Sequence, residues 1–345
     1  MEAISEPKKL ILSICMPTYN RLKYIQQALS PIINQIDDKN ADAVEILISN
    51  NASSDNTEHY IKEVIKNHPK LQIKYFCQTE NIGAERNIYY VTNQAKGDWL
   101  CILSDDDVLL PGAIDKLLTL ITNYPNFDAF CLNMYGFNQD SDPHQSSSPV
   151  FNIADDVILK NKDDALALLW VYITFLSVLV FRRDILANLD HSDKIGTFLR
   201  HSYIYLDSIS KENGIYITKD PFIATRGNNS GGYDHFKVFV SNFADVMTYA
   251  KSIGYSNFLV EKILHRNALH SLLAAIVFRK LNGSNKFIVN DREDFERIFN
   301  VYSVNFPRFL SAVPVMVAMS LPTFVFAILK KIFIILKIKR YNVLT

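Results

Sequence analysis

Three consecutive carboxylates, Asp105, Asp106 and Asp107, follow the short apolar stretch Trp99–Leu103. The stretch has the composition of a buried strand, and Pro111 with Gly112 then opens a helix-like segment. Like charges at the end of a central strand repel one another unless a positive group neutralises them. Because hard oxygen ligands suit Mg²⁺ or Mn²⁺, the cluster predicts a divalent cation that carries a diphosphate. The alternative is a solvated acidic turn beside a helix start.

The elements that position this cluster alternate between strands and helices. The predicted strands are Leu10–Met16, Val44–Ser49, Ile73–Cys77 and Trp99–Leu103, and the predicted helices are Leu22–Asn34, Thr57–Asn67 and Ile88–Gln94. Such alternation predicts a mostly parallel α/β sheet with helices on both faces. In sheets of this kind, ligands bind at the carboxyl ends of the strands.

Polar residues gather at the four predicted strand ends. They are Pro17–Arg21, Asn50–Asp55, Asn81–Gly83 and the three aspartates. Since the carboxyl ends of parallel strands share one edge of the sheet, the sequence predicts a single site there.

Composition restricts the class of protein. The 345 residues carry 36 Lys and Arg against 36 Asp and Glu, so charge gives no sign of a nucleic-acid partner. Four scattered cysteines, Cys15, Cys77, Cys101 and Cys131, are typical of reduced, buried thiols in a cytosolic protein. Residues 1–9 lack the apolar run of a signal peptide.

The order and register of four motifs resemble a known enzyme family. Ser13–Arg21, Glu45–Asp55, Glu80–Asn87 and Gly97–Pro111 are similar to the motifs of family 2 glycosyltransferases, and the match covers about residues 10–135. Within the family, the chain most resembles O-antigen enzymes of the abequosyltransferase type. The resemblance implies a GT-A fold, which is a Rossmann-like, mostly parallel sheet flanked by helices, here with a helical C-terminal extension.

The resemblance also implies roles for residues at the strand ends. Nucleotide-sugar donor contacts are implied for Pro17, Thr18, Tyr19, Asn20, Arg21, Asn50, Asn81, Gly83 and Arg86. The cofactor implied is Mg²⁺ or Mn²⁺, whose chelation would stabilise the leaving diphosphate.

Two positions depart from the family pattern. Counting back from Pro111, Ser104 stands where the family has the first Asp of its metal motif. Asp106 is then the expected metal ligand and catalytic residue, with Asp107 as a second ligand and Asp105 as a ribose or sugar contact. Asn50 replaces the usual Asp, and its amide could serve cytosine, so a pyrimidine nucleotide is expected.

No Glu-Asp pair stands near Arg200–Tyr203, where inverting members carry their catalytic base. His201 is the nearest titratable group and is predicted as the base; the alternatives are an ordinary packed histidine and a retaining reaction, which needs no such base. Arg226 lies in the Gly-rich segment Thr225–Asp234, which is expected to form either a flexible loop that closes over the diphosphate or a plain surface loop. His235 is a weak candidate for a further metal ligand.

The chain is expected to comprise a nucleotide-sugar-binding part (1–137), an acceptor-binding part (138–235) and a helical extension (236–345). Phe309–Leu329 holds 21 residues without a charge, enough for a helix of about 30 Å. Two prolines interrupt this segment, and basic residues follow it: Pro314, Pro322, Lys330, Lys331, Lys337, Lys339 and Arg340. Residues 309–340 are therefore expected to associate with the inner leaflet as a peripheral or monotopic segment on the cytoplasmic face of the bacterial inner membrane; the alternative is a buried helical pair.

The function that these features favour is metal-dependent transfer of a hexosyl or deoxyhexosyl group from a nucleotide diphosphate to a lipid-linked or oligosaccharide acceptor, in O-antigen or capsule synthesis. One alternative is a polyprenyl-phosphate sugar synthase. Because no carboxylate base is recognisable, the other is a non-catalytic nucleotide-sugar-binding protein.

Overall fold

The computed structural model describes residues 10–138, 141–145, 148–227 and 237–267. The chain separates into two compact units, residues 1–229 and 230–345. The nine strands found among the described residues belong to the first unit and form one sheet in the order β3-β2-β1-β4-β8-β6-β9-β5, with β7 paired to β9.

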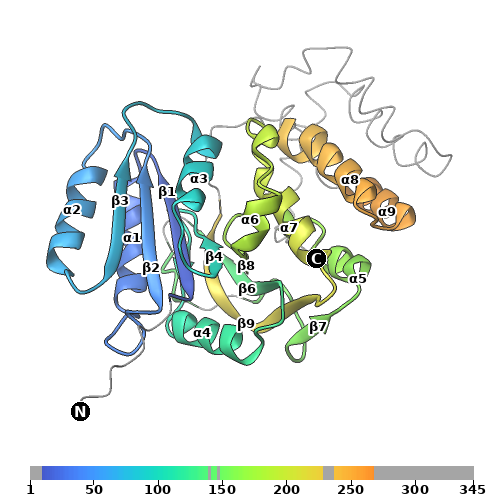
Figure 1. Cartoon of the computed structure of the whole chain (residues 1–345), viewed down its shortest axis with the longest axis horizontal. Helices are drawn as coiled ribbons and strands as arrows, with labels where there is room; N and C mark the ends of the chain where they lie inside the picture. Colours follow the sequence, from blue (N-terminus) through green and yellow to red (C-terminus); the bar gives the residue numbers. More distant parts are fainter. Residues whose placement is uncertain (1–9, 139–140, 146–147, 228–236, 268–345) are drawn as a thin grey trace, which may run out of the picture. The chain divides into compact units, whose positions relative to one another are not determined.

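The first part of the sheet is parallel, as predicted (Figure 1). Its strands are β1 (Leu12–Thr18), β2 (Val44–Asn50), β3 (Gln72–Cys77) and β4 (Trp99–Ile102). Three helices connect them: α1 (Leu22–Ile33), α2 (Thr57–Asn67) and α3 (Ala84–Asn93). The helix predicted over Thr57–Asn67 has the predicted bounds, and the α/β architecture is confirmed.

The second part adds antiparallel strands, so the whole sheet is mixed. Its strands are β5 (Val108–Leu109), β6 (Ala129–Phe137), β7 (Val157–Leu159), β8 (Leu179–Arg182) and β9 (Ile215–Arg226). Its helices are α4 (Ala113–Asn123), α5 (Lys162–Leu169), α6 (Asp184–Asn188) and α7 (Arg200–Ile209), with short 3₁₀ turns at Tyr172–Thr174 and Ser192–Lys194. β8 runs antiparallel to both β4 and β6, whereas β6 and β9 are parallel.

Burial explains which strands are central. Every residue of β2 is buried and β1 is buried at all but one position, because both strands are covered on two faces. β3 is the edge strand, and none of its residues is fully buried. Cys77, its last residue, is exposed, so the expectation of four buried thiols is wrong at this position; Cys15, Cys101 and Cys131 are buried, and all four are free.

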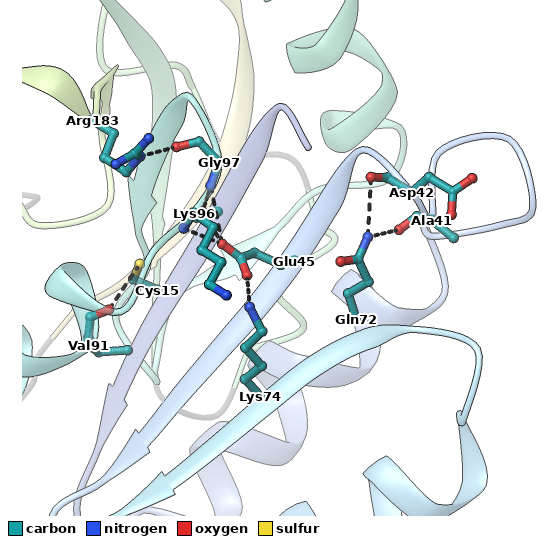
Figure 2. Close-up of polar contacts among 11 residues, drawn as sticks. Cys15, Ala41, Asp42, Glu45, Gln72, Lys74, Val91, Lys96, Gly97 and Arg183 are labelled. Carbon is teal, nitrogen blue, oxygen red and sulfur yellow. Dashed lines mark hydrogen bonds and ion pairs between the residues drawn. The ribbon is translucent and has the colours of Figure 1, made fainter. Parts of the chain in front are cut away.

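A buried carboxylate fixes the amino-terminal edge of the sheet (Figure 2). Glu45 of β2 is fully buried and accepts hydrogen bonds from Ser13 Oγ at 2.7 Å, Lys74 Nζ at 2.6 Å and the Lys96 backbone N–H at 2.6 Å. Burial alone would raise the pKa of Glu45, but these hydrogen bonds together lower it. Glu45 thereby ties the start of β4 to β1, β2 and β3.

Close packing at the same turn requires a glycine. A Cβ on Gly97 would lie 2.7 Å from Ser13 Oγ and 2.8 Å from the Ser13 nitrogen. The Gly97 carbonyl accepts a hydrogen bond from Arg183 Nε at 2.8 Å, which links this turn to the end of β8 (Figure 2). The register of β4, and with it the position of the three aspartates, is set from this end.

The described part of the second unit contains a π-helical turn at Lys237–Asn242 and the helices α8 (Phe243–Ser252) and α9 (Asn257–Asn267), which pack together. Within the residues that the structure describes, no helix is both long and apolar enough to span a membrane. The segment 309–340 and His235 lie outside the described residues, so the expectations for them stay predictions.

Candidate functional site

The three carboxylates after β4 point toward three different sets of partners. Asp106 accepts a hydrogen bond from Ser104 Oγ at 2.5 Å on one oxygen and pairs with Arg21 Nη1 at 2.9 Å through the other. Asp107 accepts hydrogen bonds from Ser177 Oγ at 2.6 Å and from the Arg226 backbone N–H at 3.0 Å. The third carboxylate, Asp105, is oriented toward the loop after β1 and accepts from the backbone of Tyr19.

Burial gives two of these carboxyls unusual proton affinities. Burial first and the charge of Asp106 second raise the pKa of Asp105 to about 7, against the opposing charge of Arg21. The same two causes raise the pKa of Asp107 to about 7, although hydrogen bonds from Ser177 and Arg226 oppose the shift. Asp105 and Asp107 are therefore partly protonated at neutral pH, and a nearby positive charge would favour their ionised forms.

The loops after β1 and β2 hold one another in place. The Asn20 backbone N–H donates to Ser53 Oγ at 2.8 Å, and the Ser54 backbone N–H donates to Asn20 Oδ1 at 2.7 Å. Asp55 accepts from the Leu22 backbone N–H at 3.2 Å, at the start of α1. Asn20 has φ 51° and Ala52 has φ 58°. These left-handed residues sit in the two loops that meet, which is where backbone strain is expected at a ligand site.

The rest of the first loop lies at the same strand end. Pro17 and Thr18 are the last residues of β1, and Thr18 pairs in register with Asn50 of β2. Tyr19, by contrast, is 41% exposed. An exposed aromatic ring beside buried polar groups can stack on a planar ligand.

Asn50 is fully buried, and both ends of its amide have partners within the protein. Its Nδ2 donates to Tyr75 Oη at 2.9 Å, and its Oδ1 accepts from the Ser53 backbone N–H at 3.0 Å. An amide has two donor hydrogens and two acceptor lone pairs, so capacity remains on each end.

Asn51 was not assigned a role from the sequence, yet it joins the second loop to the third. Its Nδ2 donates to Asn81 Oδ1 at 2.8 Å, and its Oδ1 accepts from the Ile82 backbone N–H at 2.9 Å. Asn81 also accepts from the Gly83 backbone N–H, and Gly83 has φ 88°, a conformation that favours glycine. The predicted gathering of polar loops at this edge is thus present as a chain of hydrogen bonds.

The third loop leads into α3, where Arg86 is exposed in the first turn. Its neighbour Glu85 is buried and accepts hydrogen bonds from the backbone N–H groups of Gly196 and Arg200. Glu85 therefore ties the first turn of α3 to the start of α7. Nothing in local sequence spacing marks this contact, because the partners lie more than a hundred residues away.

Arg226 does not lie on a loop, which corrects the expectation for this residue. It is the last residue of β9 and is 8% exposed. Its guanidinium donates to the Asp106 carbonyl at 3.3 Å and to Gln27, and its Cζ lies 4.4 Å from the centre of the Phe137 ring. Pairing of β9 with β6 extends as far as Arg226, which fixes its backbone. Its contacts with Asp106 and Asp107 then hold the aspartate segment in place from the protein interior.

His201 is packed inside α7. It is 8% exposed, and its Nε2–H donates to the Thr174 carbonyl at 2.9 Å. Burial first, and the charge of Arg200 last, lower its pKa to about 4. A base with that pKa is poorly matched to proton transfer at neutral pH. His201 holds the Thr174 carbonyl, and Ser177, three residues further along the chain, donates to Asp107. This arrangement suits a residue that positions the aspartate segment; the assignment of His201 as catalytic base stays a prediction.

In the part of the chain that the structure describes, no three His, Cys, Asp or Glu side chains are arranged as a ready metal site. The divergent directions of the three aspartates explain this. Mg²⁺ is nevertheless commonly held by one or two carboxylates together with substrate phosphate oxygens. Asp106, which is 2% exposed, and its neighbour Asp107 are the carboxylates that would take part in such an arrangement, in which a diphosphate supplies the remaining ligands.

Comparisons with known proteins agree with this geometry. The family model for Glycosyl transferase family 2 matches residues 13–189. Abequosyltransferase RfbV of Salmonella typhimurium is 38% identical over 112 residues, which are 32% of this chain and 33% of that protein. A Campylobacter jejuni protein named GalNAc(5)-diNAcBac-PP-undecaprenol beta-1,3-glucosyltransferase is 36% identical over 108 residues, 31% of this chain and 33% of its own length. The chain thus spans about a third of the length of these relatives.

Two solved structures share the fold at low identity. S. aureus TarS 1-349 in complex with UDP-GlcNAc has a TM-score of 0.58 at 17% identity, over 85% of this chain and 80% of that one. Mannosyltransferase PcManGT from Pyrobaculum calidifontis, in complex with GDP-Man and Mn²⁺, has a TM-score of 0.53 at 16% identity, over 91% of this chain and 87% of that one.

Proposed function

The chain belongs to glycosyl transferase family 2, and we propose that it moves a sugar from a nucleotide-diphosphate donor to a lipid-linked or oligosaccharide acceptor in surface polysaccharide synthesis. The proposal rests on the chain of hydrogen bonds that joins the loops after β1, β2 and β3, and on the ion pair between Arg21 of the first loop and Asp106 after β4. These segments, residues 17–21, 50–55, 81–83 and 105–107, are called the strand-end loops. Names of relatives support the acceptor class, because one abequosyltransferase and one undecaprenol-linked glucosyltransferase are among them.

The nucleotide-sugar donor is assigned to the strand-end loops. Tyr19 offers an exposed ring for the base, and Asn50 keeps amide capacity for a pyrimidine edge. Asn81, Gly83, Arg86 and Asp105 are assigned to the sugar and diphosphate. The neighbouring folds hold UDP-GlcNAc in one case and GDP-Man in the other, which supports a nucleotide-diphosphate sugar without choosing the base.

Asp106 and Asp107 would hold Mg²⁺ or Mn²⁺, and such a cation supplies charge stabilisation for a departing diphosphate. The protein's own part is to keep these carboxylates in place. Ser104 and Ser177 each donate a hydroxyl to one of them, while Arg226 holds the Asp106 carbonyl and the Asp107 carboxylate. Arg21 remains close enough to meet the phosphate oxygens with charge-assisted hydrogen bonds.

The direct test is release of nucleoside diphosphate from a panel of nucleotide sugars by the purified chain, with Mn²⁺ and after chelation. We expect turnover of at least one donor, lost on chelation. Binding of a donor without any turnover, with or without an acceptor extract, would instead identify a non-catalytic nucleotide-sugar-binding protein.

Membrane association is proposed for residues 309–340 on composition alone. Truncation after Phe306 should release the protein from anionic liposomes and reduce transfer to a lipid-linked acceptor more than donor hydrolysis. A full-length chain that ignores such liposomes without detergent would contradict this part of the proposal.

A further inference from the structure

We infer that Arg21 is a built-in counter-ion of Asp106 that competes with the divalent cation for this carboxylate until a nucleoside diphosphate arrives. The inference rests on the proposed function. Its basis is the 2.9 Å ion pair between Arg21 Nη1 and Asp106 Oδ2, in which the Asp106 side chain is 2% exposed and the Arg21 side chain 23% exposed.

Asp106 has little room for a second cation in this arrangement. One of its oxygens accepts the Ser104 hydroxyl at 2.5 Å, and the other is occupied by Arg21. A divalent ion at the same oxygen would stand beside the guanidinium, and two positive charges at that separation repel. Cation and Arg21 therefore exclude each other when no other negative group is present.

The structure distinguishes Arg21 from the second guanidinium of the site. Arg226 is stacked between the rings of Tyr24 and Phe137 and is 8% exposed, so it is fixed in the protein interior. The Arg21 guanidinium also lies over the Tyr24 ring, with its Cζ 5.2 Å from the ring centre, but its side chain is 23% exposed. The Arg21 backbone carbonyl accepts the N–H groups of Tyr24 and Ile25 in the first turn of α1. Its side chain can move toward solvent while the helix start stays in place.

A diphosphate changes the balance because it brings oxygen anions that serve both cations. The cation gains phosphate ligands, and the guanidinium exchanges a carboxylate for phosphate, which suits its planar donor geometry. Arg21 then moves from an inhibitory contact to a donor contact. The inference predicts weak cation binding to the free protein and strongly coupled binding of cation and diphosphate.

The test is Mn²⁺ affinity of the full chain without nucleotide, measured by paramagnetic resonance of free Mn²⁺. We expect Arg21→Gln to bind Mn²⁺ at least tenfold more tightly than the unmodified chain. Arg21→Lys keeps the charge and should stay weak. Lys70→Gln makes the same change in net charge at a side chain that is 84% exposed, and should have no effect.

Arg21→Met is a second uncharged variant, and its apolar side chain can still pack near the Tyr24 ring. Circular dichroism checks that each variant is folded. The companion measurement is UDP affinity with saturating Mn²⁺, which both uncharged variants should weaken. If they bind Mn²⁺ no better than the unmodified chain, the inference is overturned, while nucleotide-supported Mn²⁺ binding would leave the proposed function intact. If the unmodified chain binds no Mn²⁺ even with nucleoside diphosphates, the metal-dependent function itself fails.

Discussion

The two halves of the sheet organise their polar groups in different ways. In the parallel half, the loops after β1, β2 and β3 are held by Asn, Ser and Asp side chains that bond to backbone groups of neighbouring loops. In the mixed half, the residues near the site are buried and brace it from behind, as Ser177 and Arg226 do for Asp107. Under the proposed function, the parallel half would present groups to the ligand, and the mixed half would hold those groups in place.

This difference teaches where each kind of substitution should act. Substitutions in the strand-end loops should alter ligand affinity and turnover. Substitutions of the buried residues that support them, such as Ser177 and Arg226, should first lower the free energy of unfolding.

Asp106→Ala should reduce donor turnover about 1000-fold, because it removes the expected metal ligand and the partner of Arg21. The assay is release of nucleoside diphosphate from the best donor in the presence of Mn²⁺. Asp38→Ala, at a side chain that is 92% exposed, is the matched control and should retain activity. Near-unchanged turnover in a folded Asp106→Ala protein would refute the assignment.

Glu45→Gln should lower the free energy of unfolding by about 3 kcal/mol, because the amide has a single acceptor oxygen for donors that now bond to both carboxylate oxygens. Urea unfolding measures the loss. Nucleotide affinity of the folded fraction should stay the same, since Glu45 lies near the amino end of β2 and the strand-end loops follow the carboxyl ends. A loss below about 1 kcal/mol would show that the hydrogen bonds to Glu45 contribute little to stability.

His201 should make the protein acid-sensitive. Burial lowers its pKa from 6.5 to about 4, so the unfolded state takes up the proton first as pH falls. The contribution of neutral His201 to the free energy of unfolding is therefore fully present above pH 6.5 and is lost as the pH falls toward 4. Between pH 7.5 and 5, His201→Gln should remove about 2 kcal/mol of this pH dependence relative to the unmodified chain.

The same variant separates the two roles considered for His201. Glutamine can still donate to the Thr174 carbonyl, so a positioning role predicts that His201→Gln keeps most turnover and loses the acid sensitivity. Turnover that collapses at neutral pH in a stably folded His201→Gln protein would support the assignment of His201 as the base and contradict the positioning role.

Nucleotide preference should give the smallest effect. We expect uridine or cytidine diphosphate to bind about tenfold more tightly than guanosine diphosphate, a difference of about 1.4 kcal/mol. Asn50 and the loop after β1 carry this expectation, and thermal shift with the four common diphosphates measures it. A clear preference for guanosine diphosphate would show that the β2 turn reads the base in another way.

The sequence predicted those features that depend on neighbours along the chain. Helix α2 and the strand before the three aspartates follow from local periodicity, and the loops at the strand ends follow from parallel pairing. It could not predict that consecutive aspartates diverge, because their directions are set by Arg21, Ser177 and Arg226, which are distant in sequence. Arg226 was misplaced for the same reason, since pairing of β9 with β6 extends into a Gly-rich segment.

The measurement that tests the central account most directly is calorimetric titration of UDP and CDP into the chain, with and without Mn²⁺, compared between the unmodified protein and Asp106→Asn. Asparagine preserves the shape of the side chain and removes its charge. The account predicts that Mn²⁺ strengthens diphosphate binding to the unmodified chain and that Asp106→Asn loses this increment. An equal Mn²⁺-dependent increment in both proteins would contradict the assignment of Asp106 to the donor site.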